Sequence, residues 1–591
     1  MKFGHIGVLI AVFAVAGCSP KSPEESAGAG GGEVLQHNFT LSQQEFDALA
    51  PETQFMVANK ALSTMYRGLP ADEFFDLTQG LDNPVIQQTN FIVNTQVALK
   101  KELKSEELIE QERLLKGVDD DPATDDINEE VDPLFELNDS QRHQAYMARV
   151  QSYPLSHDFF VYWMSYFLAN TIMFSPAVEM ESTDNKDIGR TLSYLKLSLS
   201  SGTDIRATIK GWLNNLSRWR VSRSPENHAL EMYELYLGKF NDTEEDQLNT
   251  LNGGIACSDR YLGDDGDDYE LLFADGHIPQ TVKVFGKYIS SCGDLYDVVS
   301  GHPLLIPRVT EVIVNYFLDG ASAEAKTQLI QNIVSTGPEY FEDIFLPIIF
   351  SKEFLLNSER PKTFEENALN FLHAMHWTPR SNQGYLDEYM MRYLLDFDRS
   401  SLEVGVHNMG WSSMEYKIGR TPFLPMDVLS FASYHKAIRE NVLLWDRAFD
   451  GNHHPTEERF TEDADNPRQP PYAIHDGAFY KAGTQDLKAE LDALNAEEFI
   501  DLVFLTALGR RANSEEVAVF LKEAGPDVRD DSNAIIEDYL DYIREDEDGV
   551  MQLRRYASGE TLYENSADNF AELMLDYISR LPEFYYYKAA N

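Results

Sequence analysis

The chain has 591 residues, which is too long for one ordinary domain of roughly 100–200 residues. Its hydrophobic content of 43% is enough for a substantial core. The formal net charge of -49 argues against nucleic-acid binding and against electrostatic attachment to an anionic membrane, because both need a basic surface. We therefore expect no nucleic-acid partner.

The first eighteen residues have the features of a bacterial lipoprotein signal. Lys2 gives a positive start, and Ile6 to Ala16 form an apolar stretch that is too short to span a bilayer. The stretch ends in Val15 to Cys18 (VAGC), which resembles the lipobox that is cleaved before a cysteine carrying acyl chains. By that resemblance, residues 1–17 are the signal peptide and Cys18 is the lipidated first residue of the mature protein.

A flexible tether is predicted after the anchor. Ser19 follows the cysteine, and we expect the outer membrane because an Asp there would suggest retention in the inner membrane. Residues 18–44 are rich in Pro, Ser and Gly and include the run Gly30 to Gly32, a composition typical of a flexible linker. The protein is thus expected in the cell envelope, anchored to the membrane through lipid and facing the periplasm or the cell surface.

Helical periodicity dominates the rest of the chain. Apolar residues recur at mixed three- and four-residue spacing, the pattern of a helix with one buried face. Strand patterns are scarce, and Thr281 to Phe285 is the best short candidate. The fold class expected is therefore all-α (mainly α). The predicted helices are Phe46–Leu62, Pro84–Leu115, Gln141–Met173, Leu192–Trp219, Pro307–Leu318, Ala323–Val334, Phe364–Met375, Leu386–Leu395, Val428–Trp445, Ala496–Leu508, Ser514–Ala524, Ser532–Arg544 and Ser566–Ser579.

Composition marks the loops and the domain boundaries. Gly117 to Asp132 is a dense acidic run that we expect to be a solvated loop, and the Gly/Asp-rich segment Asn252 to Gly286 is predicted to be irregular. Residues 451–480 are rich in His, Pro and Asp and indicate a linker. We therefore expect one large multi-helix body over residues 45–450, with irregular acidic loops, and a small C-terminal helical module over residues 481–591.

Cys257 and Cys292 are the only cysteines besides the predicted anchor. An exported protein lies in a compartment that permits disulfides, and the spacing of the pair closes a loop of moderate length. The pair forms either a disulfide or two buried free thiols. No CxxC motif is present, so we do not expect a zinc site of the cysteine type.

Several motifs, taken in order, resemble a large family of exported bacterial proteins of unknown function known as DUF1800. Ser224 to Gly238 (SPENHALEMYELYLG) is similar to the family signature NENYARELxELxTLG. Asp275 to His277 with Lys283 are similar to its Asp-x-Gly-x-Lys-x-x-x-Gly loop, and further short motifs follow in the family's order. The resemblance covers residues 45–450, although the signature's Arg is Leu230 here. It implies a helical fold and an exported habitat but no reaction, since the family has no established activity.

The helix predicted to begin at Pro225 has the most suggestive polar face. Asn227, Glu231 and Glu234 fall at i, i+4 and i+7 and therefore share one side, while Glu226 lies in the first turn. Carboxylates and an amide on one face could bind a hard cation or supply acid and base groups. The alternative is a solvated or salt-bridged helix face.

A second acidic cluster surrounds Gly266. Calcium usually takes about six to eight oxygen ligands and needs a turn that folds them inward, and this segment has both the oxygens and the glycine. Its spacing does not match the EF-hand loop, so the alternative to a calcium site is an exposed acidic turn. The candidate ligands are Asp264, Asp265, Asp267, Asp268 and Glu270.

Two functions remain open. The one we expect is an outer-membrane-anchored helical lipoprotein that binds an envelope protein or an extracellular polymer such as a polysaccharide. It is favoured by the lipobox, by the tether and by the lack of any nucleophile-elbow, P-loop or dinucleotide motif. The alternative is a metal-dependent envelope enzyme, such as a hydrolase, that uses the acidic helix face. Its other candidate residues are Asp275, His277 and Lys283.

Overall fold

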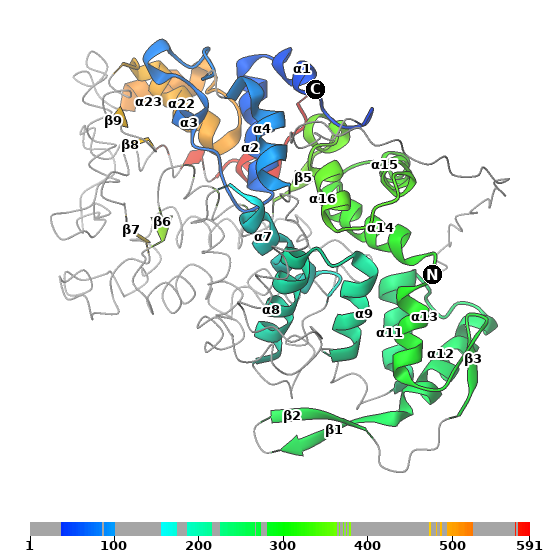
Figure 1. Ribbon diagram of the computed structural model, residues 1–591. Helices are drawn as coiled ribbons and strands as arrows, with labels where there is room; N and C mark the ends of the chain where they lie inside the picture. Colours follow the sequence, from blue (N-terminus) through cyan, green and yellow to red (C-terminus); the bar gives the residue numbers. More distant parts are fainter. Residues whose placement is uncertain are drawn as a thin grey trace, which may run out of the picture. The chain divides into compact units, whose positions relative to one another are not determined.

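Helices dominate the computed structural model, which confirms the mainly α fold class (Figure 1). The described residues begin at residue 37 and belong to a compact unit that spans Val34–Asn591. The predicted signal peptide, Cys18 and most of the tether precede residue 37 and therefore lie outside the described residues. Within the described residues, no helix is both long and apolar enough to cross a membrane. The structure describes residues 37–85, 88–100, 155–173, 186–215, 225–265, 268–273, 280–362, 378–379, 472–473, 480–481, 485–486, 493–523 and 580–590, and the single positions 366, 370, 374, 574, 577 and 578.

The first predicted helix, Phe46–Leu62, is two helices in the structure. Helix α1 spans Gln43–Asp47 and α2 spans Pro51–Ser63. The break falls at Ala50, which is extended (ψ 148°) because a residue before proline disfavours the helical conformation. Two further helices follow in this region, α3 (Ala71–Phe74) and α4 (Phe91–Leu99).

The helix predicted over Leu192–Trp219 is likewise divided. Helix α8 spans Lys186–Ser201 and α9 spans Ile205–Asn215. Gly202 lies between them with a φ of 72°, a left-handed conformation that favours glycine and ends the first helix. Of the helix predicted over Gln141–Met173, the described part is α7, His157–Asn170.

Aromatic side chains hold the centre of the core together. Trp163 of α7 is fully buried, and its ring lies 5.5 Å from that of Phe167 on the same helix. It also contacts Phe317 at 6.2 Å and Phe345 at 5.3 Å, from helices α14 (Leu305–Phe317) and α16 (Glu342–Ile349). These large rings join three helices that are distant in the sequence. The predicted helices Pro307–Leu318 and Ala323–Val334 are confirmed as α14 and α15 (Ala323–Ser335).

Two glycines bring helix α12 (Glu244–Ala256) close to α11 (Pro225–Leu237). A Cβ atom at Gly253 would lie 2.7 Å from Cβ of Ala229, and one at Gly254 would lie 2.8 Å from Cα of Glu226. No larger residue fits either position without a shift of the helices. Gly238, with a φ of 64°, follows the last residue of α11.

The segment Asn252–Gly286, predicted to be irregular, instead holds the end of α12, a β-hairpin and half of a second hairpin. Strands β1 (Arg260–Asp265) and β2 (Asp268–Phe273) pair antiparallel, as do β3 (Val282–Val284) and β4 (Lys287–Ile289). The second hairpin confirms the strand predicted at Thr281 to Phe285. The β1–β2 hairpin was not predicted. Acidic residues and glycine are depleted in strands, and their presence here obscures the alternating apolar pattern of a strand.

The C-terminal helices pack on the N-terminal ones. Helix α22 (Ala496–Leu508) has the predicted bounds, ends at Gly509 with a φ of 70°, and contacts α2 and α3. Arg511, which follows it, forms ion pairs with Asp82 and Asp501. Helix α23 spans Ser514–Glu523, and Ala524, the last residue of the predicted helix, lies outside the described residues. The described helices of the expected C-terminal module thus share one hydrophobic core with the N-terminal body.

Both ends of the described chain pair with a single segment, residues 350–362. Near the N-terminal end, Thr40 forms an antiparallel bridge with Ser351. At the C-terminal end, β10 (Tyr586–Tyr587) pairs with β5 (Arg360–Pro361), after the 3-10 helix Pro582–Tyr585. The remaining short strand pairs are β6 (Thr378–Pro379) with β7 (Tyr472–Ala473) and β8 (Tyr480–Lys481) with β9 (Gln485–Asp486).

Lys60 is buried where the C-terminal end docks. Its Nζ atom donates to the carbonyl oxygens of Ser358 at 2.7 Å and Lys588 at 3.3 Å. Burial, with a further contribution from the charge of Arg360, lowers the pKa of Lys60 to about 7, against the opposing charges of Glu359 and Glu353. The folded protein therefore holds this amine largely neutral at alkaline pH.

This lowered pKa predicts a specific pH dependence of stability. Between pH 7 and 10.5 the unfolded chain binds a proton at Lys60 that the folded chain does not, so stability must rise as the pH rises. Relative to Lys60→Met, we expect the free energy of unfolding of the wild type to increase by about 1 kcal/mol per pH unit in this range and to level off below it. Urea denaturation of both proteins across the range measures the difference, and parallel curves would contradict the prediction.

Candidate functional site

The acidic face predicted on the helix from Pro225 is present on α11, but it does not line a described cavity. Glu226 and Asn227 are exposed, while Glu231 and Glu234 are half-buried. The opposite side of the helix packs into the core. The structure therefore places these four residues on the outer part of a packed helix.

The loop residues expected to complete that site are not brought to it by any described contact. Lys283 lies on β3 with an exposed side chain, and its backbone oxygen accepts a hydrogen bond from Asn252 Nδ2 at 2.8 Å. Asp275 and His277 lie outside the described residues. The prediction of a shared site therefore stays untested for these two.

Four of the five candidate calcium ligands fall on strands β1 and β2. Asp264 and Asp265 are the last residues of β1, and Asp268 and Glu270 belong to β2, so the backbone there is paired strand. Asp267 lies outside the described residues. A calcium loop folds its ligands around one point, and the described backbone shows a hairpin at this position.

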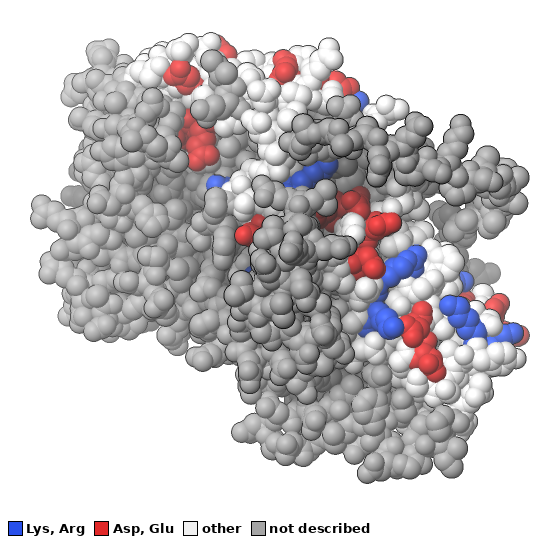
Figure 2. All heavy atoms as spheres, viewed as in Figure 1, with Lys and Arg blue, Asp and Glu red and all other residues white. Residues whose placement is uncertain are grey.

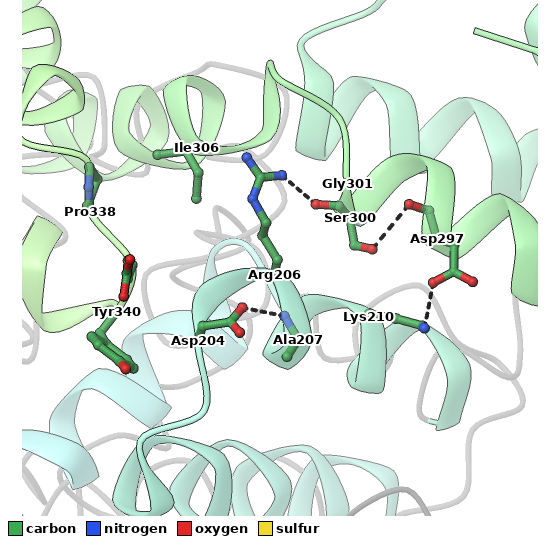
Figure 3. A pocket seen from close by; sticks show the side chains of 11 residues that line it. Asp204, Arg206, Ala207, Lys210, Asp297, Ser300, Gly301, Ile306, Pro338 and Tyr340 are labelled. Atoms are coloured by element: carbon green, nitrogen blue, oxygen red, sulfur yellow. Dashed lines mark hydrogen bonds and ion pairs between the residues drawn. The ribbon is translucent and has the colours of Figure 1, made fainter. Parts of the chain in front are cut away.

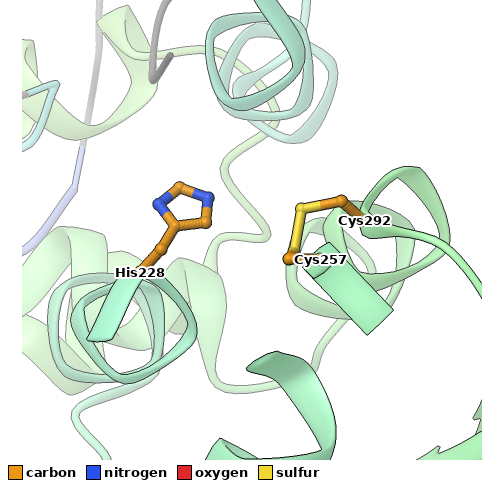
Figure 4. Close-up of side chains that lie close together, drawn as sticks. All are labelled: His228, Cys257 and Cys292. Atoms are coloured by element: carbon orange, nitrogen blue, oxygen red, sulfur yellow. A yellow bond between two sulfur atoms is a disulfide. The ribbon is translucent and has the colours of Figure 1, made fainter. Parts of the chain in front are cut away.

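Cys257 and Cys292 form a disulfide, which decides between the two alternatives left open by the sequence. The bond joins the end of α12 to the first residue of α13 (Cys292–Ser300), and both cysteines are fully buried. The buried side chain of His228 lies near the disulfide (Figure 4). Its Nε2 atom is 2.9 Å from Tyr296 Oη. The imidazole nitrogen and the two sulfurs lie within 4.8 Å of one another. Because metal binding by cysteine requires thiolates, the bonded sulfurs act here as a covalent link in the core.

A pocket opens between α9, the C-terminal end of α13 and the segment that precedes α16 (Figure 3). Its volume is about 630 Å³, within the range of small-molecule sites. Ile205 N, at the start of α9, donates to Glu339 O at 2.9 Å and so fixes the two walls relative to each other. We call this the α9–α13 pocket. Its lining residues are Asp204, Arg206, Ala207, Lys210, Asp297, Ser300, Gly301, Ile306, Pro338, Glu339 and Tyr340.

Arg206 is held in place by carbonyl groups at the end of α13. Its Nη1 atom donates to Ser300 O at 2.6 Å and to His302 O at 3.0 Å. A cation is favoured at a helix C-terminus, where unpaired carbonyls give a partial negative charge. The remaining N–H groups of the guanidinium, on Nε and Nη2, have no acceptor among the residues that the structure describes. One edge of Arg206 is therefore fixed, while the other is available to a ligand.

Three other charged side chains that line the pocket, those of Lys210, Asp297 and Asp204, already have partners within the protein. Lys210 Nζ forms an ion pair with Asp297 Oδ1 at 2.5 Å at the rim, where both side chains are exposed. Asp204 Oδ1 accepts a hydrogen bond from Ala207 N at 2.8 Å and so caps α9. Burial lowers the pKa of the adjacent His302, and the charges of Lys239, Lys287 and Arg206 lower it further, which keeps this imidazole neutral at pH 7.

Acidic and basic side chains alternate on the face where α9 and α13 lie (Figure 2). Within the α9–α13 pocket, three acids outnumber two bases, in keeping with the net charge of -49. Tyr340 adds an aromatic surface, since 41% of this large side chain is exposed. The pocket thus combines hydrogen-bond donors, acceptors and an aromatic ring.

The sequence did not point to this pocket. Its residues come from segments around positions 206, 300 and 339, which meet only after folding, and no motif in them predicts a ligand site. The one local signal was the tripeptide Pro338–Tyr340, an aromatic residue in a short polar connection between two helices.

The fold and this site define a mainly α protein with an open polar pocket. Comparison of the chain with protein-family models, with curated proteins and with solved structures finds no match in any of the three. The resemblance of its motifs to the DUF1800 family stays a prediction.

Proposed function

We propose that this protein is an outer-membrane lipoprotein whose helical body binds a partner or polymer of the cell envelope. The observation that carries the proposal is the α9–α13 pocket, where a fixed guanidinium lies beside carboxylates and an exposed tyrosine. The lipobox at Cys18 and the Gly-rich tether support the envelope location. A pocket of this kind on a tethered body would take its ligand from the aqueous side of the membrane.

The metal-dependent enzyme receives no comparable support from the described residues. General acid–base or metal chemistry requires its groups to converge on one substrate. Glu226 and Asn227 are instead exposed on α11, and no residue of that acidic face lines the α9–α13 pocket.

The anchor is tested by Cys18→Ala. Without the thiol no diacylglycerol can be attached, so we expect the variant to leave the membrane fraction, whereas the wild type stays in the outer-membrane fraction and incorporates labelled palmitate. Ser19→Ala is the matched control and should behave as the wild type. A Cys18→Ala protein that still fractionates with the outer membrane would contradict the proposed anchor.

A further inference from the structure

The α9–α13 pocket carries donors and acceptors in the arrangement that suits hydroxyl groups. The free edge of Arg206 offers N–H donors, and Glu339 and Asp204, which also line the pocket, carry carboxylate oxygens. A hydroxyl group can donate one hydrogen bond and accept others, so it can satisfy both kinds of group at once. A ligand with neighbouring hydroxyls therefore matches this lining better than a ligand with donors or acceptors alone.

The apolar part of the pocket is concentrated on one side. Pro338 and Tyr340 lie across from Ser300 and Gly301, with Arg206 between them (Figure 3). Leaving a large part of an aromatic ring in water costs free energy that a ligand can recover by covering it. The flat C–H face of a sugar ring can cover such a ring while its hydroxyls reach the polar groups.

Charge decides which kind of sugar polymer fits. The pocket has more acids than bases, and its Lys210 is already paired with Asp297. The whole chain has a net charge of -49, which repels an acidic polymer before it reaches the site. A basic peptide would be attracted to the protein, but it has no acceptor to offer the free edge of Arg206 except its backbone. An uncharged sugar meets neither obstacle.

We propose that the α9–α13 pocket binds an uncharged sugar chain, with Arg206, Asp204 and Glu339 binding its hydroxyls and Tyr340 packing on a ring face. This inference rests on the proposed function, because it names the ligand class of the same site. The pocket is open to solvent, so it can hold one or two units of a chain whose ends continue outside it.

Titration calorimetry of the full mature lipoprotein in detergent tests the assignment. The probes are neutral tetrasaccharides of glucose and of N-acetylglucosamine in several linkages, with tetragalacturonate as the acidic probe and tetralysine as the basic one. We expect at least one neutral tetrasaccharide to bind at about 1 mM or below, the usual strength of one shallow site. We expect tetragalacturonate not to bind, and any binding of tetralysine to the acidic surface to be unchanged by variants of the pocket. Tyr340→Ala and Glu339→Gln should each weaken that binding about ten-fold. Both residues are exposed, so the fold should be retained.

The matched control is Tyr288→Ala, which removes another tyrosine, 76% exposed, that does not line the pocket. It should leave sugar binding unchanged. Absence of binding by every neutral probe, or binding that Tyr340→Ala and Glu339→Gln leave unchanged, would overturn the inference. Binding of tetragalacturonate or tetralysine that these variants abolish would also overturn it, since the ligand would then be a charged polymer or a peptide. The anchor is judged separately by the fractionation of Cys18→Ala, so the two proposals can fail independently.

Discussion

Replacing Glu366 by Gln is expected to lower the free energy of unfolding by about 3–5 kcal/mol, the range for breaking a buried ion pair. Arg360 donates from Nη1 to Glu366 Oε2 at 3.0 Å and from Nη2 to Oε1 at 2.5 Å, and both side chains are fully buried. Burial alone would lower the pKa of Arg360, but the charge of Glu366 raises it above its ordinary value. Glutamine preserves the shape and removes the charge, which leaves the guanidinium in the core without its carboxylate.

Urea denaturation at neutral pH measures this loss. Glu359→Gln is the matched control, because Glu359 is adjacent to Arg360 in sequence but exposed, and it should change stability by no more than about 0.5 kcal/mol. The double change Arg360→Met with Glu366→Leu should recover much of the loss, since apolar residues of similar volume often replace a buried pair without cost. A Glu366→Gln protein as stable as the wild type would show that the pair contributes nothing.

The second large effect is expected from removing the disulfide with Cys257→Ala and Cys292→Ala. The two cysteines are 35 positions apart, and the chain-entropy model for a loop of this size gives a loss of about 4 kcal/mol. Both lie in the core, where the smaller alanine side chains also leave part of the packing unfilled. We therefore expect a clearly lower urea midpoint for the double variant.

A reductant supplies the control for the disulfide. Wild-type protein that is unfolded and refolded with a dithiol reductant should lose about the same stability, whereas the double variant should not respond to the reductant at all. Equal urea midpoints for the wild type and the double variant, both without reductant, would contradict the prediction.

The parts of the fold that follow from local signals could be predicted from the sequence. Helix α22 has the bounds that hydrophobic periodicity predicted, with Gly509 as its expected end. The structure shows that its start is also fixed locally, by a capping box of Asn495 and Glu498. Helix α13 carries an equally local signal, a capping box formed by Ser291 and Asp294, yet it was not predicted because it lies beside a Gly/Asp-rich segment. Hydrophobic periodicity alone also failed to divide α1 from α2 and α8 from α9.

The candidate site could not be predicted in the same way. Arg206 is in position because its guanidinium meets Ser300 O, and Tyr340 is in position because its segment is bound to the start of α9. Both contacts join segments that are far apart in the sequence, so no local sequence pattern could predict them. The acidic face of α11 was visible in the sequence for the opposite reason: the residues share a helix, but sharing a helix does not give them a common ligand.

The pairing of both chain ends with residues 350–362 has a consequence for how the protein is made. Leu41 N donates to Phe350 O, and Ala590 N, in the next-to-last residue, donates to Leu356 O. Lys60 likewise finds one of its acceptors only at Lys588. The growing polypeptide therefore cannot finish its native structure until its last residues have been synthesised. The native core therefore depends on contacts between residues that are far apart in the sequence, and such contacts form late in folding.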